Sequence, residues 1–147
     1  MSDPLRRFEA EHEEALAGLA RLQHAALALR AGAPPEPHLA AIREVLALLN
    51  GAVHDHNEAE ERALFPFIRE EAPVAPFQDE HQVLWGLERD LGAAVEQADV
   101  ERTARLGLEI VALLRAHIQR ENEVLFPLAR VLLGPAGLLA VARRLEQ

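Results

Sequence analysis

The sequence predicts an all-α protein, an up-down-up-down four-helix bundle that ends in a short C-terminal helix. Four long segments each place apolar residues three and four positions apart, which is the spacing of one helix face. Proline and glycine separate these segments, so antiparallel neighbours joined by short connections are expected. No segment alternates apolar and polar residues with a period of two, so no sheet is expected.

The 147 residues suit one domain, with a core bundle over about residues 5–131 and an extension over 134–147. The four helices are expected at about residues 4–30, 36–70, 76–97 and 99–133. Asp3 can cap the first helix, Pro4 fits its first position, and Asp99 can cap the fourth. Gly134 and Pro135 break the chain before the short apolar C-terminal helix.

The amino-acid composition limits the classes of function that are open to this chain. The chain has 15 basic and 24 acidic side chains and a net charge of −9, which disfavours nucleic-acid or anionic-membrane partners. It has no cysteine, so disulfides, thiolate metal sites and cysteine nucleophiles are excluded. The N-terminus shows no apolar signal core, and the longest apolar stretch, residues 131–142, is short and interrupted by glycine and proline. We therefore expect a cytoplasmic protein.

The chain contains an internal repeat. The segment HNEAEERALFP (56–66) matches HIQRENEVLFP (117–127) in the frame H-x3-E-x3-L-F-P. The first half opens on Glu11-His12 and the second on Glu80-His81. The two halves therefore resemble one duplicated helical hairpin. Pro66 and Pro127 are expected to bend or end their helices, because proline removes a backbone hydrogen bond.

Histidine and glutamate interrupt the apolar stripes that are expected to face the core. The stripe of the second helix includes His56, Glu60, Leu64 and Phe67, and that of the fourth includes His117, Glu121, Leu125 and Leu128. An inward carboxylate without a partner destabilises a fold by several kcal/mol or stays protonated. The chain has no lysine, and its arginines lie mostly off these stripes. A bound cation is the obvious neutraliser.

The spacing brings six donors to one level of the bundle. Each H-x3-E pair lies on one helix face, roughly 6 Å apart along the axis. The histidines of helices one and three lie near the starts of those helices, and the H-x3-E pairs lie near the ends of helices two and four, so all fall at the same end. The candidate metal ligands are His12, His56, Glu60, His81, His117 and Glu121.

Four imidazoles and two carboxylates suit two ions, which lie about 3.5–4 Å apart in two-metal sites. We expect two histidines per ion, with Glu60 and Glu121 each bridging both, and free positions for an oxo or hydroxo bridge and an exogenous ligand. Imidazole and carboxylate suit iron, manganese or zinc. Two iron ions are preferred, with manganese or zinc as substitutes, because bundles with this donor set house di-iron centres.

The order of His, H-x3-E, His and H-x3-E, with L-F-P after each glutamate motif, resembles the hemerythrin-like (HHE cation-binding) family over about residues 5–131. The resemblance implies metal roles for the six residues above. Oxygen-carrying members have a fifth histidine where this chain has Trp85, so the resemblance is to the four-histidine di-iron branch. That branch is linked to iron-centre repair, nitric-oxide or peroxide handling, and iron or oxygen sensing.

The leading hypothesis is a non-haem di-iron protein that binds or reduces O2, NO or peroxide at a centre of four histidines and two glutamates. One alternative is an iron-sensing or iron-holding module without turnover, and another is a metal-free structural bundle. The sequence shows no separate acid–base pair or nucleophile, so turnover is left open. Trp85 is expected to pack in the core near the site and His54 to lie on another face. The remaining candidates, expected toward solvent, are His24, His38, Glu58 and Glu123.

Overall fold

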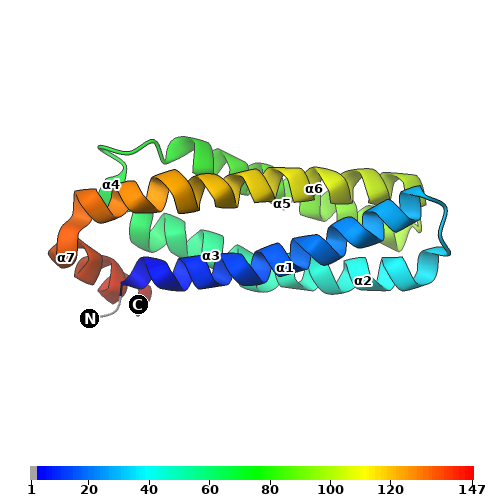
Figure 1. Ribbon diagram of the computed structural model, residues 1–147, viewed down its shortest axis with the longest axis horizontal. Helices are drawn as coiled ribbons and strands as arrows, with labels where there is room; N and C mark the ends of the chain where they lie inside the picture. Colours follow the sequence, from blue (N-terminus) through cyan, green and yellow to red (C-terminus); the bar gives the residue numbers. More distant parts are fainter. Residues whose placement is uncertain (1–2) are drawn as a thin grey trace.

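The computed structural model describes residues 3–147, and these form the expected all-α bundle (Figure 1). We call the four long helical segments of the bundle its arms. Helix α1, the first arm, spans Pro4–Arg30, and α2 begins the second arm at Pro35–Leu48. Helix α5 spans Ala75–Glu96, and α6 begins the fourth arm at Val100–Arg120. The part of the chain described contains no strand. The predicted fold class is confirmed.

The second and fourth arms continue through short wide helical turns. After α2 come the π-helical segment η1 (Leu49–Val53) and helix α3 (His54–Ala59). A second π-helical segment, η2 (Glu60–Leu64), and helix α4 (Phe65–Ile68) complete this arm. After α6 come the π-helical segment η3 and helix α7, at Glu121–Leu125 and Phe126–Leu145. Each H-x3-E glutamate therefore begins a π-helical turn, a feature that is frequent at functional sites.

Two predicted helix caps are confirmed. The side chain of Asp3 accepts a hydrogen bond from the Leu5 amide at 2.9 Å, and that of Asp99 accepts one from the Arg102 amide at 3.1 Å. Each satisfies an amide at the start of a helix that has no partner in the helix itself. The caps fix where the first and fourth arms begin, and so set the depth of the histidines that follow.

The π-helical turns correct the predicted stripes. Phe65 donates its amide to the Glu60 carbonyl, and Phe126 donates to that of Glu121, each skipping one residue more than an α-helix does. The extra residue rotates the following turn. As a result Phe65 and Phe126 are fully buried, whereas Phe67, predicted to face the core, is 43% exposed. Neither Pro66 nor Pro127 ends its helix, because each lies in the first turn of the α-helix that follows a π-helical segment, where proline is tolerated.

The apolar core lies in two clusters. One fills the end of the bundle near the α1–α2 connection and includes Leu22 and Ile110. The other fills the end near α4 and includes Phe8 and Phe126. On every arm the metal-ligand candidates lie between residues of the two clusters. The core is thus divided by one polar layer.

Helix α7 changes direction at Gly134, whose φ of 61° is a left-handed conformation that favours glycine. The chain then folds back toward the N-terminal end of α1 (Figure 1). Val141 is fully buried in the second core cluster, and Arg62 donates to the Arg144 carbonyl at 2.8 Å. By length and composition alone the run 100–145 is apolar enough to span a membrane, and 22% of its most apolar window is buried.

Candidate metal centre

The structure brings all six candidate ligands together in the polar layer. Each is at most 6% exposed, and both glutamates are fully buried. They form two sets whose ligand atoms lie within 4.8 Å of one another, and both sets contain Glu60 and Glu121. One set adds His12 and His56, and the other adds His81 and His117. Two histidines and two shared carboxylates are therefore available to each of two ions.

Each glutamate lies between one histidine of each set. Glu60 places one carboxylate oxygen 3.4 Å from His56 Nε2 and the other 3.4 Å from His81 Nε2. Glu121 places its oxygens 2.9 Å from His12 Nε2 and 3.4 Å from His117 Nε2. Two atoms that each lie ~2.1 Å from one ion are roughly 3.0–3.4 Å apart for octahedral to tetrahedral angles. The spacing fits carboxylates that bridge two ions.

Within residues 3–147 most of the inward-facing atoms lack hydrogen-bond partners, apart from His12 Nε2 and Glu121 Oε1, which contact each other at 2.9 Å. His56, His81 and His117 each have a buried Nε2 without a hydrogen bond. Both carboxylate oxygens of Glu60 and one of Glu121 are also unpartnered. Native structures rarely leave buried polar atoms unsatisfied, and such clustering calls for a bound group. The donor set of imidazole nitrogen and carboxylate oxygen fits iron, manganese or zinc.

The outward Nδ1 atoms explain why the Nε2 atoms face the centre. Every ligand histidine donates from Nδ1 to an acceptor on a neighbouring arm. The pairs are His12–Asn122 at 2.7 Å, His56–Glu11 at 2.8 Å, His81–Glu61 at 2.5 Å and His117–Glu80 at 2.9 Å. In a neutral ring this leaves a lone pair on Nε2. Partners of this kind orient metal-binding histidines and strengthen them as donors.

Burial and charge shift the pKa values of Glu60 and Glu121 in opposite directions. Burial raises the pKa of Glu60 well above its usual range, and the nearby Glu121 charge raises it further. Burial alone would also raise the pKa of Glu121, but the neighbouring His117 and His12 rings outweigh burial and lower that pKa. Without an ion, these opposite shifts favour a proton on Glu60 over one on Glu121. Two cations would remove the need for that proton.

Four phenylalanines surround the histidine rings. Phe126 stacks on His12 with ring centroids 5.4 Å apart, and Phe65 stacks on His81 at 6.1 Å. Phe8 and Phe77 meet His56 and His117 edge-on, at 5.0 and 5.3 Å. The stacked pair comes from the two L-F-P motifs, which explains why that motif follows each glutamate. The rings exclude water from the polar layer and fix the imidazole planes.

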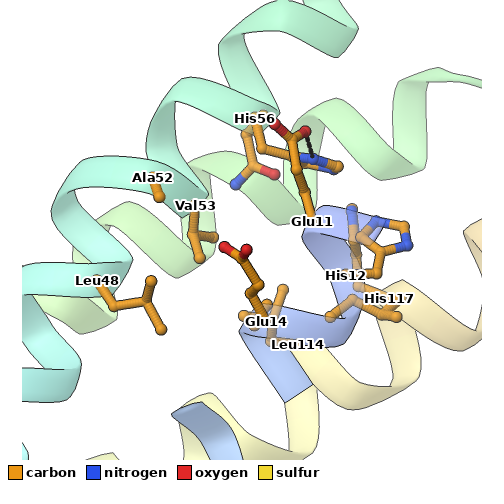
Figure 2. Close-up of a pocket in the computed structure, with 12 residues that line it drawn as sticks. Glu11, His12, Glu14, Leu48, Ala52, Val53, His56, Leu114 and His117 are labelled. Atoms are coloured by element: carbon orange, nitrogen blue, oxygen red, sulfur yellow. Dashed lines mark hydrogen bonds and ion pairs between the residues drawn. The ribbon is translucent and has the colours of Figure 1, made fainter. Parts of the chain in front are cut away.

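A small cavity of about 60 Å³ opens beside the centre, between α1 and the second arm (Figure 2). Its floor includes His12, His56 and His117, and Figure 2 shows Glu11 reaching across to His56. The remaining wall is largely apolar, and it contains Ala15, Leu48, Ala52, Val53, Leu114 and Ile118. One water occupies at least ~10–15 Å³ on this measure, so a diatomic molecule or peroxide fits.

Sequence reasoning missed the Nδ1 partners. The repeated Glu-His pairs at 11–12 and 80–81 were the available signal, because each glutamate reaches the histidine of the next arm. The prediction that Trp85 packs in the core is wrong: it is 40% exposed and packs against His54, with ring centroids 4.3 Å apart. The other solvent candidates, His24, His38, Glu58 and Glu123, lie outside the centre.

A family model described as the hemerythrin HHE cation binding domain matches residues 3–129. No curated protein and no solved structure matches the chain significantly. The matched segment contains all six buried donors and both L-F-P motifs.

Proposed function

Because the chain belongs to the hemerythrin HHE cation-binding family, we propose that it is a non-haem di-iron protein that binds or reduces a small ligand such as O2, NO or peroxide. The observation that supports this most strongly is the set of unpartnered Nε2 and carboxylate atoms that face one another in the buried layer. Two cations would satisfy these atoms, and no neighbouring side chain in residues 3–147 does so.

The roles follow from the contacts. His12 and His56 would hold one ion, and His81 and His117 the other, with Glu60 and Glu121 bridging both. When bound, the iron pair supplies the redox chemistry. The protein orients the imidazoles through their Nδ1 hydrogen bonds and excludes water with the phenylalanine rings. Manganese or zinc would fit the same donors.

The small apolar cavity supports a small ligand. It reaches three of the four histidines, and its volume of about 60 Å³ excludes larger organic substrates. Its acidic lining residues are Glu11, which is engaged with His56, and the exposed Glu14. The cavity therefore offers few proton donors for turnover. This favours, as a second candidate, an iron-sensing or iron-holding module that binds the ligand without consuming it.

Elemental analysis of protein purified without chelator tests the proposal. We expect about two iron ions per chain, and ferrous iron added in air should produce charge-transfer absorption in the near ultraviolet. A variant that carries both His56→Leu and Glu60→Leu should retain no iron pair and lose the metal-dependent rise in melting temperature. His38→Gln, on the connection side of the bundle, is the matched control and should behave like the wild type.

Three outcomes separate the candidates. Peroxide consumption or NO binding by the iron-loaded protein supports reactivity at the centre, whereas retention of iron with neither supports the holding module. A colourless wild-type protein that keeps no iron contradicts both. It would favour a structural bundle, in which the double leucine variant is as stable as the wild type or more so, with or without metal.

For location we propose the cytoplasm, without nucleic-acid or membrane partners. The negative net charge supports this, and so does the kink at Gly134, which interrupts the apolar run that ends the chain. Cell fractionation tests it: the protein should remain in the high-speed supernatant, and recovery in washed membranes would contradict the proposal.

A further inference from the structure

A second cavity lies on a different face of the bundle, between the α3–η2 region and α5. Its volume is about 300 Å³, and its lining includes the candidate ligand His81 itself. The other residues that matter here are His54, Glu58, Glu61, Trp85 and Glu88. Among residues 3–147 no arginine lines it, and the chain has no lysine. Three carboxylates therefore line one cavity, and among these residues no arginine or lysine lines it with them.

Glu88 is the least expected of the three carboxylates. It is 4% exposed, lines the cavity, and has a carboxylate oxygen with no hydrogen-bond partner. Burial raises the pKa of Glu88 to about 7. Keeping an unpartnered carboxyl in this position destabilises the fold, so a role beyond packing is indicated.

Glu61 connects this cavity to the buried centre. Its side chain accepts from His81 Nδ1 at 2.5 Å, and His81 Nε2 faces the bridging Glu60. Both Glu61 and His81 line the cavity. A cation held in the cavity is thus one side chain away from a proposed ligand of the centre.

The duplicated half lacks this chemistry. At the equivalent positions, Arg115 replaces His54, Gln119 replaces Glu58, and Asn122 replaces Glu61. On α1, Leu16 replaces Trp85 and the fully buried Leu19 replaces Glu88. Three carboxylates on one face therefore correspond to none on the other. The acidic character is specific to this cavity and does not follow from the repeat.

We propose that this cavity binds a hydrated divalent cation and delivers it to the buried centre, an inference that rests on the proposed metal site. Among residues 3–147, the donor sets close enough to coordinate an ion directly are the two in the centre. The cavity donors are farther apart, so an ion held there would keep its waters. A volume of about 300 Å³ accommodates an ion with its first water shell, since a water takes ~30 Å³ in the liquid. Carboxylate and water oxygens suit hard divalent cations such as Mn²⁺.

Paramagnetic broadening by Mn²⁺ tests binding directly. The chain has one tryptophan, so the Trp85 indole N–H gives a single assignable signal. In protein whose centre is filled with Zn²⁺, which Mn²⁺ displaces poorly, Mn²⁺ should broaden this signal first. The double variant Glu58→Gln, Glu88→Gln should need at least about fivefold more Mn²⁺. Broadening spread evenly over acidic surfaces, or absent at Trp85, overturns the proposal.

Loading kinetics test delivery. Co²⁺ uptake by metal-free protein, followed by visible absorption, should be about five- to tenfold slower in the double variant while the final occupancy stays at two ions. Glu14→Gln, which removes a carboxylate from the smaller cavity, is the matched control and should load at the wild-type rate. If Glu14→Gln loads more slowly and the double variant loads normally, metal enters through the smaller cavity, and the proposed delivery through the larger cavity is overturned.

The two proposals fail separately. If the wild type retains no Zn²⁺ by elemental analysis, the buried centre is refuted, and the Mn²⁺ titration of metal-free protein then decides whether the cavity binds cations. Circular dichroism establishes that each variant is folded. His54→Gln, at a partly exposed position, provides a second variant and should weaken Mn²⁺ binding in the same direction.

Discussion

The two histidine pairs of the centre occupy equivalent positions in duplicated halves, yet their surroundings differ. We call His12 and His56 the first pair, and His81 and His117 the second pair. The residue after each bridging glutamate supports one histidine of a pair: Asn122 accepts from His12, whereas Glu61 accepts from His81. The first pair is therefore held by one carboxylate and one amide, and the second by two carboxylates.

This difference shows how a duplicated hairpin becomes an asymmetric site. A carboxylate partner increases electron donation from the ring more than a neutral amide does. The second pair should thus stabilise the more highly charged ion. The small apolar cavity includes both histidines of the first pair and one of the second. The repeat places matched donors in both halves, and single differences outside the donor set distinguish the two proposed ion positions.

The largest expected effect contrasts the bridging glutamates. With metal present, Glu60→Gln and Glu121→Gln should each weaken binding of the ion pair by more than about 100-fold, because each carboxylate serves both ions. Without metal they should differ. The raised pKa of Glu60 favours its neutral form, so its replacement should change stability little. Glu121→Gln instead removes a charge that lies beside the His12 and His117 rings, and should cost about 2 kcal/mol.

Urea unfolding with chelator, and again with Zn²⁺, measures both parts of this contrast. Equal losses of stability for the two variants in chelator would show that the proton is not held on Glu60 as described.

The next largest effect is expected from substitutions that exchange Glu61 and Asn122, the residues that distinguish the two histidine pairs. Glu61→Asn should lower the affinity of the second position by about tenfold, and Asn122→Glu should raise that of the first, which makes the two positions more alike. Competition of Co²⁺-loaded protein with a chelator resolves two affinities in the wild type. If Glu61→Asn leaves both affinities unchanged, the asymmetry does not come from these partners.

The third effect concerns Glu88, which stands where the first half has Leu19. The pKa of Glu88 is raised to about 7 in the folded protein, so the native state holds a proton that the unfolded state releases near pH 4.5. The loss of folding stability caused by ionising Glu88 is therefore absent below about pH 4.5, grows up to about pH 7 and is constant above it. In metal-free protein, Glu88→Gln should stabilise by up to about 3 kcal/mol at pH ~8 and very little at pH ~4.

Chemical unfolding in chelator across this pH range measures the Glu88 effect, with the exposed Glu13→Gln as control. A gain of the same size at every pH would contradict the account, since it would not depend on ionisation.

The smallest effect compares the arginines behind the two Glu-His pairs. Arg7 contacts Glu11 at 3.4 Å on the surface, whereas Arg120 is paired with Glu80 and lies over the Phe77 ring, 5.5 Å from its centroid. Burial alone would raise the pKa of Glu80, but hydrogen bonds from Arg120 and His117 outweigh it and lower that pKa. Arg120→Ala should cost about 1 kcal/mol and Arg7→Ala less than about 0.5 kcal/mol. Thermal unfolding of both variants checks the order.

The sequence predicted the architecture and the convergence of the six donors because both depend on long-range periodicity. Asp3 and Asp99 set the helix starts, and the H-x3-E spacing places donors on one face whatever the details of packing. Periodicity cannot reveal an inserted π-helical turn. Leu64 and Leu125 are buried as predicted, but Phe67 was wrongly assigned to the core in place of Phe65.

The surroundings of the centre were not predictable in the same way. Glu61 and Asn122 follow Glu60 and Glu121 in the chain and lie off the predicted stripes. Only the packing of adjacent arms brings them to His81 and His12. Trp85 was predicted to pack in the core near the site, but it lies on the α3 side of the bundle, against His54. Which side chains contact each other between arms depends on how each helix is rotated about its own axis. The apolar pattern of one sequence does not determine that rotation.

Anomalous diffraction from crystals loaded with iron tests the central claim most directly. We predict two anomalous peaks about 3.5–4 Å apart, each bonded to two Nε2 atoms and to one oxygen from each of Glu60 and Glu121. A single peak, peaks away from the four histidines, or a buried layer that holds no iron would contradict it.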